Sequence, residues 1–310
     1  MSKIKTFIKL LKMPIKLIPP LANKGVLNWM PDKTLIKLMY KSRMGKPLNL
    51  DNPRSFSEKL QWLKLYDRKP WYSRLVDKYE VRSYIEETIG KDYLIPLYGV
   101  WDDPDEIDFD GLPDQFVLKC THDSGSVIIC QDKTKLDKNK AKKKLKRAQR
   151  FNFYYCSREW PYKNVKPRII AEEYLCDSKH KDLVDYKFFC FSGVPTHCQA
   201  ICGRNTYKTM DFFDMDWHQQ VFRRVSGQGK AYPLANEPIP QPTTFHTMKA
   251  AAEQLSKGIP FVRVDFYEVK GKMYFGEVTF YPASGFCAFE PDEWDDILGS
   301  WIQLPEKTSQ

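Results

Sequence analysis

Hydrophobic positions change their spacing several times along the chain, and the changes divide it into helical and extended segments. Helical periodicity predicts helices over residues 58–66, 72–89, 133–150 and 245–257. Alternating or short apolar runs predict strands over residues 93–100, 115–120, 127–130, 168–175, 186–191, 194–201, 261–269 and 273–280. Helices and strands follow one another irregularly, and several strands adjoin through short turns. This order predicts an α+β fold and not a doubly wound sheet.

Short polar residues mark the ends of several of these segments. Ser55 or Ser57 is placed to cap the helix that follows the turn at residues 52–57. Gly90 and Gly258 are suited to end the helices before them, because glycine adopts the left-handed conformation of a helix C-terminus.

The most informative segment is residues 261–280, FVRVDFYEVKGKMYFGEVTF, which predicts a hairpin. If its loop has three residues, Asp265 lies opposite Glu277 and Arg263 lies opposite Thr279, all on one face. Two bare carboxylates about 5 Å apart repel each other, and a hard cation such as Mg²⁺ removes the repulsion. The hairpin therefore predicts a metal site. The alternative is a polar outer face in which the arginine neutralises the acids, and a two-residue turn would put the acids on opposite faces.

A second polar feature follows the strand that ends near Lys119. Residues 121–126, THDSGS, form a hydroxyl-rich turn that can present backbone N–H groups to a phosphate. The segment has one glycine and no P-loop motif, so an ordinary hairpin turn remains the alternative.

Charge is distributed unevenly over the 310 residues, which have a net charge of +10 and are 42% hydrophobic. Residues 1–25 contain six lysines and no acid, and residues 133–150 contain ten Lys or Arg and one acid. The remaining chain is mildly acidic, which argues against nucleic acid as a partner. The second basic segment predicts a solvated helix.

Residues 1–18 combine apolar positions at helical spacing with lysines on another face. Pro14 is expected to end or kink this helix and Pro19-Pro20 to stop it. Such a helix suits an anionic membrane surface, and packing on the protein body is the alternative. No apolar run long enough to span a membrane, no cleavable signal and no CxxC pair among the eight cysteines is present. The predicted location is cytoplasmic, with peripheral contact at the inner membrane face as an open alternative.

The motifs taken in order resemble the TupA-like branch of the ATP-grasp superfamily, which occurs in bacterial surface-polysaccharide biosynthesis. The resemblance covers about residues 50–300 and rests on these motifs: NPRSFSEKLQWLKLYDR, DKYEVRSYI, FVLKCTHDSG, REWPYKNVKPRIIAEEYL, DYKFFCF, PFVRVDFY and FGEVTFYP. It implies an α+β ATP-grasp fold with two subdomains that clasp a nucleotide. The implied divisions are an N-terminal extension (1–50), a pre-domain (51–113), a lid subdomain (114–175) and a C-terminal subdomain with the metal site (176–310).

The resemblance also implies roles for individual residues, with ATP and Mg²⁺ as cofactors. Phosphate contacts are expected from Lys78, Lys119 and the loop residues His122, Ser124, Gly125 and Ser126. Adenine contacts are expected from Glu172, Glu173 and Leu175. Metal ligands are expected to be Asp265, Glu277 and Thr279, while Arg263 and Lys187 are expected to contact the reacting groups. The implied reaction joins a carboxylate to an amine through an acyl-phosphate, with small-molecule or glycan-linked substrates.

Three positions depart from the pattern of the family. Asp123 and Ser126 stand where glycines are typical, and Thr279 stands where an asparagine usually ligates the metal. An acid in a phosphate loop is unfavourable unless its side chain points away. Asp123 therefore supports one rival interpretation, a weakly catalytic binding protein.

Two further alternatives arise from short motifs. The DxD at Asp214-Met215-Asp216 is the spacing with which glycosyltransferases hold a metal and a sugar-nucleotide diphosphate. His197, Cys198 and Cys202 offer zinc-ligand types, although on a strand the histidine faces away from the cysteines. Buried structural cysteines are the other interpretation of that segment.

Overall fold

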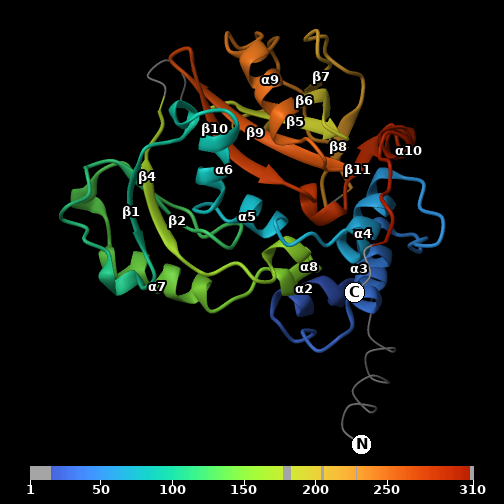
Figure 1. The fold of residues 1–310 in the computed structure, drawn as a ribbon. Helices are drawn as coiled ribbons and strands as arrows, with labels where there is room; N and C mark the ends of the chain where they lie inside the picture. Colours follow the sequence, from blue (N-terminus) through green and yellow to red (C-terminus); the bar gives the residue numbers. More distant parts are fainter. Residues whose placement is uncertain (1–14, 177–182, 204–205, 228, 308–310) are drawn as a thin grey trace, which may run out of the picture.

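Three antiparallel sheets organise the protein (Figure 1), whose computed structural model describes residues 15–176, 183–203, 206–227 and 229–307. A four-stranded sheet has the order β1-β4-β2-β3, a five-stranded sheet has the order β10-β9-β5-β6-β7, and β11 pairs with β8. The strands are β1 (Leu97–Trp101), β2 (Phe116–Cys120), β3 (Ile128–Cys130), β4 (Ile169–Glu173), β5 (Asp185–Phe191), β6 (Val194–Cys202), β7 (Thr209–Phe213), β8 (Arg223–Val225), β9 (Phe261–Val269), β10 (Lys272–Thr279) and β11 (Ala288–Glu290). The predicted α+β class is confirmed.

The helices lie around these sheets and between them. They are α2 (Ile18–Asn23), α3 (Asp32–Met44), α4 (Phe56–Tyr66), α5 (Tyr72–Val76), α6 (Val81–Thr88), α7 (Lys138–Gln149), α8 (Tyr154–Ser157), α9 (Phe245–Leu255) and α10 (Glu293–Ser300). Within the described ranges, none of them has the length and apolarity needed to cross a bilayer.

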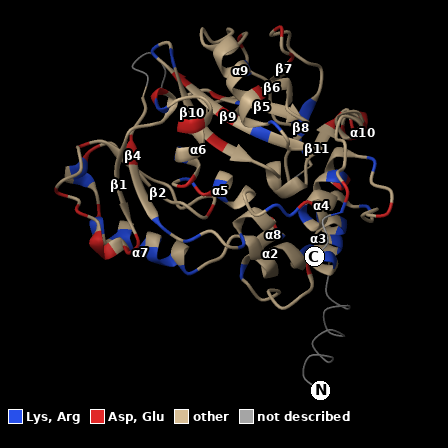
Figure 2. Cartoon of the chain, viewed as in Figure 1, with Lys and Arg blue, Asp and Glu red and all other residues tan. Residues whose placement is uncertain are grey.

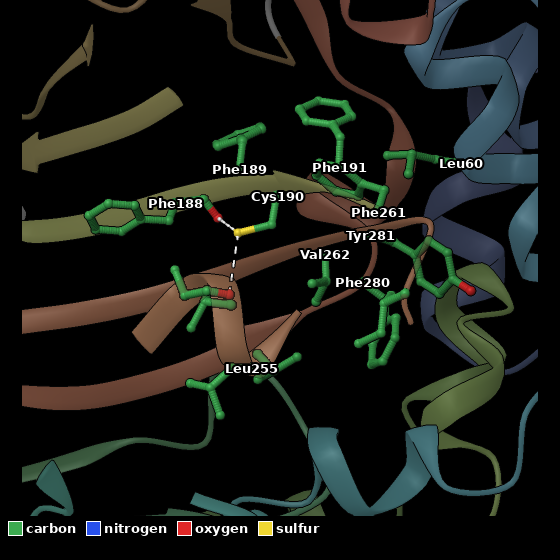
Figure 3. Packing of buried hydrophobic residues seen from close by; sticks show 14 of the residues in the cluster. Leu60, Phe188, Phe189, Cys190, Phe191, Leu255, Phe261, Val262, Phe280 and Tyr281 are labelled. Carbon is green, nitrogen blue, oxygen red and sulfur yellow. Dashed lines mark hydrogen bonds between the residues drawn. The ribbon is translucent and has the colours of Figure 1, made fainter. Parts of the chain in front are cut away.

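The five-stranded sheet is covered on both faces by apolar side chains (Figure 3). On one face, α9 packs against β5, where the Cys190 thiol lies 3.9 Å from the Ala252 carbonyl. On the other face, Phe56 at the start of α4 contacts Phe261 edge-on, with ring centroids 4.8 Å apart. Alternation along β9 places Arg263 and Asp265 on this second face, beyond the phenylalanine end of the strand. The core thus holds the polar strand positions rigidly.

Helix α4 begins where the sequence predicts a cap. Ser55 accepts a hydrogen bond from the Glu58 backbone N–H, and the Glu58 side chain accepts from the Ser55 N–H, which forms a capping box. Ser57, the other candidate, instead donates to Asp295 in α10 at 2.8 Å. The cap therefore ties the start of α4 to the C-terminal helix.

Two predictions about helix boundaries are wrong. Residues 72–89 form two helices, α5 and α6, because Asp77 accepts from the Tyr79 N–H at 2.9 Å and interrupts the helix. Pro19 and Pro20 lie in the first turn of α2 and do not stop a helix there, because the first helical turn has no need of their missing N–H groups. The amphipathic segment predicted over residues 1–18 lies mostly outside the described residues.

The basic segment 133–150 begins with a 3-10 turn and becomes α7 only after Asp137, which caps it by accepting from the Lys140 N–H. Acidic residues of the loop before β2 lie beside it (Figure 2). Asp110 binds Lys138 at 2.7 Å, and Asp105 binds Lys146. Exposed pairs of this kind contribute little to stability, because solvent screens their charges. Part of the positive charge of α7 is therefore matched by nearby acids, and the rest faces solvent.

Candidate nucleotide and metal site

The turn between β9 and β10 has two residues, and the predicted three-residue loop is wrong. Lys270 and Gly271 both have positive φ, at 53° and 74°, and Val269 pairs directly with Lys272. Such a turn matches the twist of a hairpin. Continued without interruption, its register would put the two predicted metal-binding acids on opposite faces.

A β-bulge at Gly276 restores the predicted pairing. Phe275 pairs with Phe266, the next paired residue is Glu277 opposite Asp265, and Gly276 is left between them. A side chain at this position would meet the Asp265 carbonyl oxygen at 3.0 Å, so the backbones approach too closely for a larger residue. The bulge brings the two acids to the same face, as the hairpin pattern predicts.

Arg263 lies at the centre of this face. Its Nη2 atom is 2.7 Å from Asp265 Oδ2, 3.1 Å from Glu277 Oε1 and 3.0 Å from Thr279 Oγ1. Its Nε atom donates a further bond of 2.7 Å to Asp265 Oδ1. One cationic nitrogen is thus surrounded by the three oxygens predicted to ligate a metal.

Lys187 adds a second cation from the neighbouring strand β5. It is opposite Asp265 in the register, and its ammonium group binds Asp265 Oδ2. Asp265 is only 1% exposed, and burial alone would raise its pKa. The charges of Arg263 and Lys187 outweigh burial and lower the pKa of Asp265, so this carboxylate stays ionised.

The donor set suits a hard divalent cation. Two carboxylates and one hydroxyl converge on the Arg263 Nη2 position, and oxygen is the ligand type that Mg²⁺ prefers. Glu277 is half-exposed and reaches toward the space between the sheets, whereas Asp265 is buried at the floor. A bound Mg²⁺ would need the guanidinium group to move aside from these oxygens.

Lys78 occupies the break between α5 and α6. Its backbone N–H donates to the Thr121 carbonyl at 3.2 Å, and its partly buried ammonium group donates to the carbonyl of Asp123 in the 121–126 loop. Burial lowers the pKa of Lys78, while the charges of Glu277 and Asp123 oppose the shift. The helix break therefore points this lysine toward both the loop and the metal-binding face.

Lys119 on β2 forms an ion pair with Glu172 on the adjacent strand β4. The other oxygen of Glu172 lies 3.4 Å from Arg82 of α6. A pocket between the sheets brings these three side chains together with Lys78 and Glu277. Residues predicted from distant segments for phosphate, base and metal thus line one cavity.

The 121–126 loop is held by its own side chains. Ser126 Oγ donates to Asp123 Oδ1 at 2.6 Å and accepts from the Cys120 N–H at 2.9 Å. His122 is buried, with Nε2 3.3 Å from the Ala148 carbonyl of α7, and burial lowers its pKa. Ser124 and Gly125 form the exposed tip, where Gly125 has a φ of 122°.

The residues predicted for adenine lie at the end of β4. Glu172 is turned inward to its two cationic partners. The Glu173 N–H donates to the Pro96 carbonyl at 2.9 Å. Leu175 is partly buried in the chain that leaves the strand. This segment connects the two sheets, where a hinge contact to a base is expected.

Sequence reasoning missed several side chains around the pocket. Arg82 and Tyr162 line it directly, and Glu159 and Lys64 lie buried behind it. Lys64 Nζ donates to Ser284 and Ser157 carbonyl oxygens at 2.6 and 3.0 Å, and burial lowers the pKa of Lys64 to about 7. Both Arg82 and Tyr162 fall in motifs that support the family resemblance, but no local pattern distinguishes them from surface residues.

Lys64 fixes a strained turn that follows β10. Ala283 and Ser284 both have left-handed backbone conformations, with φ of 49° and 56°, which non-glycine residues rarely adopt. Gln61 also donates to this turn, at 2.8 Å from the Gly285 carbonyl. The turn forms part of an open pocket beyond the phosphate loop, together with Ser124 and with Asn23 and Arg43 of the N-terminal helices.

The DxD lies at the end of β7, at the opposite edge of the five-stranded sheet from β10. Asp214 uses Oδ1 to accept from the Asp216 and His218 N–H groups at 2.9 and 2.8 Å, which fixes a turn. These three side chains are close enough to share an ion, and they are partly or fully exposed. The motif is thus separate from the pocket between the sheets.

The structure does not support His197 as a zinc ligand. His197 stacks on Trp301, with ring centroids 5.4 Å apart, and burial lowers its pKa to about 4. Cys198 is buried under the sheet, and burial raises its pKa. These residues are core packing, as the alternative interpretation of that segment predicts.

Lys119 of the four-stranded sheet and Glu277 of the five-stranded sheet line the same pocket, an arrangement that fits an ATP-grasp fold. The model of the family described as TupA-like ATP-grasp matches residues 58–303, and the chain belongs to this family. Among curated proteins, none matches the sequence.

Solved structures with a similar fold are distant in sequence. D-alanine–D-alanine ligase from Bacillus anthracis, complexed with ATP, has 14% identity and a TM-score of 0.42, covering 74% of this chain and 64% of the ligase. D-cycloserine synthetase DcsG has 15% identity and a TM-score of 0.39, covering 76% and 72%. ATP-grasp ligase PsnB, complexed with its minimal precursor, Mg and ADP, has 12% identity and a TM-score of 0.35, covering 84% and 66%. The chain spans less than two thirds of the first of these proteins.

Proposed function

We propose that the protein is an ATP- and Mg²⁺-dependent ligase that joins a carboxylate to an amine through an acyl-phosphate. The observation that carries the proposal is the single pocket lined by Lys78, Lys119, Glu172 and Glu277. The pocket brings the ammonium groups of Lys78 and Lys119 close to the carboxylate and hydroxyl oxygens that surround Arg263, which supports phosphate binding there. Membership of the TupA-like ATP-grasp family supports the same reaction class.

The reaction needs no nucleophile from the protein. A substrate carboxylate oxygen attacks the γ-phosphorus of ATP, the bond from that phosphorus to the bridging oxygen breaks, and ADP leaves. An amine then attacks the acyl carbon, loses a proton and displaces phosphate. When bound at Asp265, Glu277 and Thr279, Mg²⁺ would neutralise charge on the phosphates.

Each cationic side chain has a place in this scheme. Lys78 and Lys119 approach the pocket from the α5–α6 break and from β2, where they would bind the phosphates. Arg263 and Lys187, which lie at the same face as Asp265, would orient the carboxylate and stabilise the oxyanion that forms during amine attack.

The finer assignment concerns the substrates. We propose a uronic acid or an amino acid as the carboxylate and modification of a capsular or other cell-surface polysaccharide as the setting. The support is the resemblance to the TupA-like branch. A cytoplasmic location is proposed on the same basis.

The experiment measures ADP release from ATP with panels of uronic acids and amino acids, using hydroxylamine as the amine. An acyl-phosphate reacts with hydroxylamine to form a hydroxamate, which ferric iron detects by colour. We expect ADP and hydroxamate in equal amounts with the correct acid, and neither product with Glu277→Gln. UDP release from UDP-sugars without ATP would instead support the glycosyltransferase alternative, and absence of Mg²⁺-ATP binding in calorimetry would support a binding protein.

A further inference from the structure

The N-terminal element around α2 and α3 exposes apolar side chains that its own fold keeps turned outward. Leu17, Val26 and Trp29 are 43%, 53% and 47% exposed, and we call these three residues the N-terminal patch. Their neighbours Leu27 and Met30 are almost fully buried. One side of the segment therefore packs in a small hydrophobic core, and a second apolar side is exposed to solvent.

Arg158 holds this arrangement in place. Its guanidinium group is 1% exposed and its Nη2 atom donates to the carbonyl oxygens of Leu27, Asn28 and Met30 at 3.0, 3.3 and 3.0 Å. Because three carbonyl groups bind one guanidinium group, the backbone of residues 27–30 is held in place. The outward direction of Trp29 is thus built into the fold and does not result from a loose surface loop.

The charge of the same element has one sign. Residues 15–50 contain seven Lys or Arg and a single acid, Asp32. Asp32 is neutralised by Arg68 at 2.7 Å and Arg158 at 3.0 Å. Lys33, Lys37 and Lys41 are exposed at successive i, i+4 positions of α3 and form a basic stripe.

We infer that the N-terminal patch and the basic stripe of α3 dock on an anionic lipid surface. Exposed tryptophan and aliphatic side chains on the same element as exposed lysines are suited to a charged headgroup region, because the rings enter the interface while the ammonium groups meet anionic lipids. A nucleic acid would be attracted by the lysines alone and would not need the apolar groups. In Figure 1 the loop that carries Val26 and Trp29 lies at the lower edge of the molecule, beside α2.

Docking would also orient the open pocket beyond the phosphate loop. That pocket is lined by Asn23, Met39 and Arg43 of the N-terminal element and by Ser124 and Ser284 of the site. A substrate held at the lipid surface would therefore reach the site through this pocket. This step rests on the proposed function, whereas docking itself does not.

The test is co-sedimentation of the full chain with vesicles of phosphatidylglycerol and phosphatidylcholine in equal parts, and with phosphatidylcholine alone. Val26→Ser/Trp29→Ser removes the apolar groups. Val194→Ser/Val221→Ser removes two more exposed valines, 59% and 82% exposed, from the five-stranded sheet and the loop after β7. We expect the patch variant to bind mixed vesicles at least about tenfold more weakly, from the apolar area lost. The control variant is expected to bind like the wild type.

A second variant, Lys33→Gln/Lys37→Gln/Lys41→Gln, is expected to weaken binding to mixed vesicles and to reduce its dependence on phosphatidylglycerol. Thermal unfolding of every variant checks that its fold is retained. Equal binding of wild type and patch variant would overturn the inference. Two other results would also overturn it. In the first, RNA competes with vesicles for the wild type and binds the patch variant equally well. In the second, the wild type is a dimer that does not bind vesicles, and the patch variant is a monomer.

Discussion

Asp265 and Glu277 are both expected metal ligands, but their surroundings predict different consequences for their amides. Asp265 is buried and accepts two 2.7 Å bonds from Arg263 and one from Lys187. Asparagine at this position keeps one acceptor and turns an NH₂ group toward a cation. Removing one partner of a buried ion pair destabilises a protein by about 3–5 kcal/mol. Because asparagine retains one acceptor, we expect Asp265→Asn to lower the free energy of unfolding by about 3 kcal/mol.

Glu277→Gln should behave otherwise. Its side chain is 48% exposed and its contact with Arg263 is a single 3.1 Å bond. Exposed ion pairs contribute about 0–1 kcal/mol, so this variant should unfold close to the wild type. Both variants should lose Mg²⁺-dependent ATP turnover, but only Glu277→Gln loses it with the fold fully retained.

The assay is urea and thermal unfolding in the presence of a chelator, so that metal binding does not enter. At about 2–4 °C per kcal/mol, Asp265→Asn should lower Tm by about 6–12 °C. The pKa of Asp265 is lowered in the folded protein, so its contribution is present above the ordinary carboxyl pKa of 3.8. It is lost as the pH falls through the lower folded pKa, and the difference between wild type and variant should shrink there.

Two results would refute this reasoning. Asp265→Asn with the stability of the wild type would mean that the carboxylate does not hold two cations. A well-folded Glu277→Gln with normal turnover would remove Glu277 from the metal site and, with it, the main support for the ligase.

Three further predictions concern the surroundings of the pocket. Lys119→Ala should raise the KM for ATP several-fold in an ADP-release assay, because one phosphate cation is lost, and an unchanged KM would exclude Lys119 from the nucleotide site. Lys64→Met should destabilise the protein by about 3 kcal/mol in urea unfolding, since it leaves buried carbonyl acceptors unpaired; wild-type stability would contradict the contacts described here. The His197 pKa is lowered from 6.5 to about 4 by burial, so the unfolded chain binds more protons between these values and stability falls as the pH decreases across them. As the pH falls over that range, the free energy of unfolding of His197→Phe should decrease by about 3 kcal/mol less than that of the wild type. Parallel stability–pH profiles of the two proteins would show that the ring does not titrate in this way.

The hairpin of β9 and β10 shows how a sequence pattern can predict which residues pair without predicting the turn and bulge that produce the pairing. Alternation along residues 261–280 predicts that Asp265 faces Glu277, and the structure agrees. The predicted route was an odd-numbered loop, whereas the protein uses a two-residue turn and then a bulge at Gly276. A bulge leaves little trace in a hydrophobic pattern, because one added residue shifts the alternation as an extra loop residue does.

The cationic side of the site was less accessible to sequence reasoning. Helical periodicity alone predicts Lys78 inside one continuous helix over 72–89, and only the family resemblance implies its contact with phosphate. The Asp77 turn that breaks the helix is a local contact, but the Lys78 N–H also donates to the carbonyl of Thr121, in the loop after β2. Arg82 binds Glu172 across ninety positions of the chain, and no periodicity predicts a contact of that separation.

The departures at Asp123 and Ser126 are best understood together. Considered singly, an acid where a glycine is typical suggests repulsion of phosphate. In the structure the Asp123 carboxylate accepts from Ser126 Oγ at 2.6 Å, and the same hydroxyl accepts from the Cys120 N–H at 2.9 Å. The Asp123 carboxylate therefore points to the base of the loop, while the tip at Ser124 and Gly125 stays exposed. Each of the two residues supplies the partner that the other needs, so the pair acts as a brace and the acid no longer argues for a weak phosphate loop.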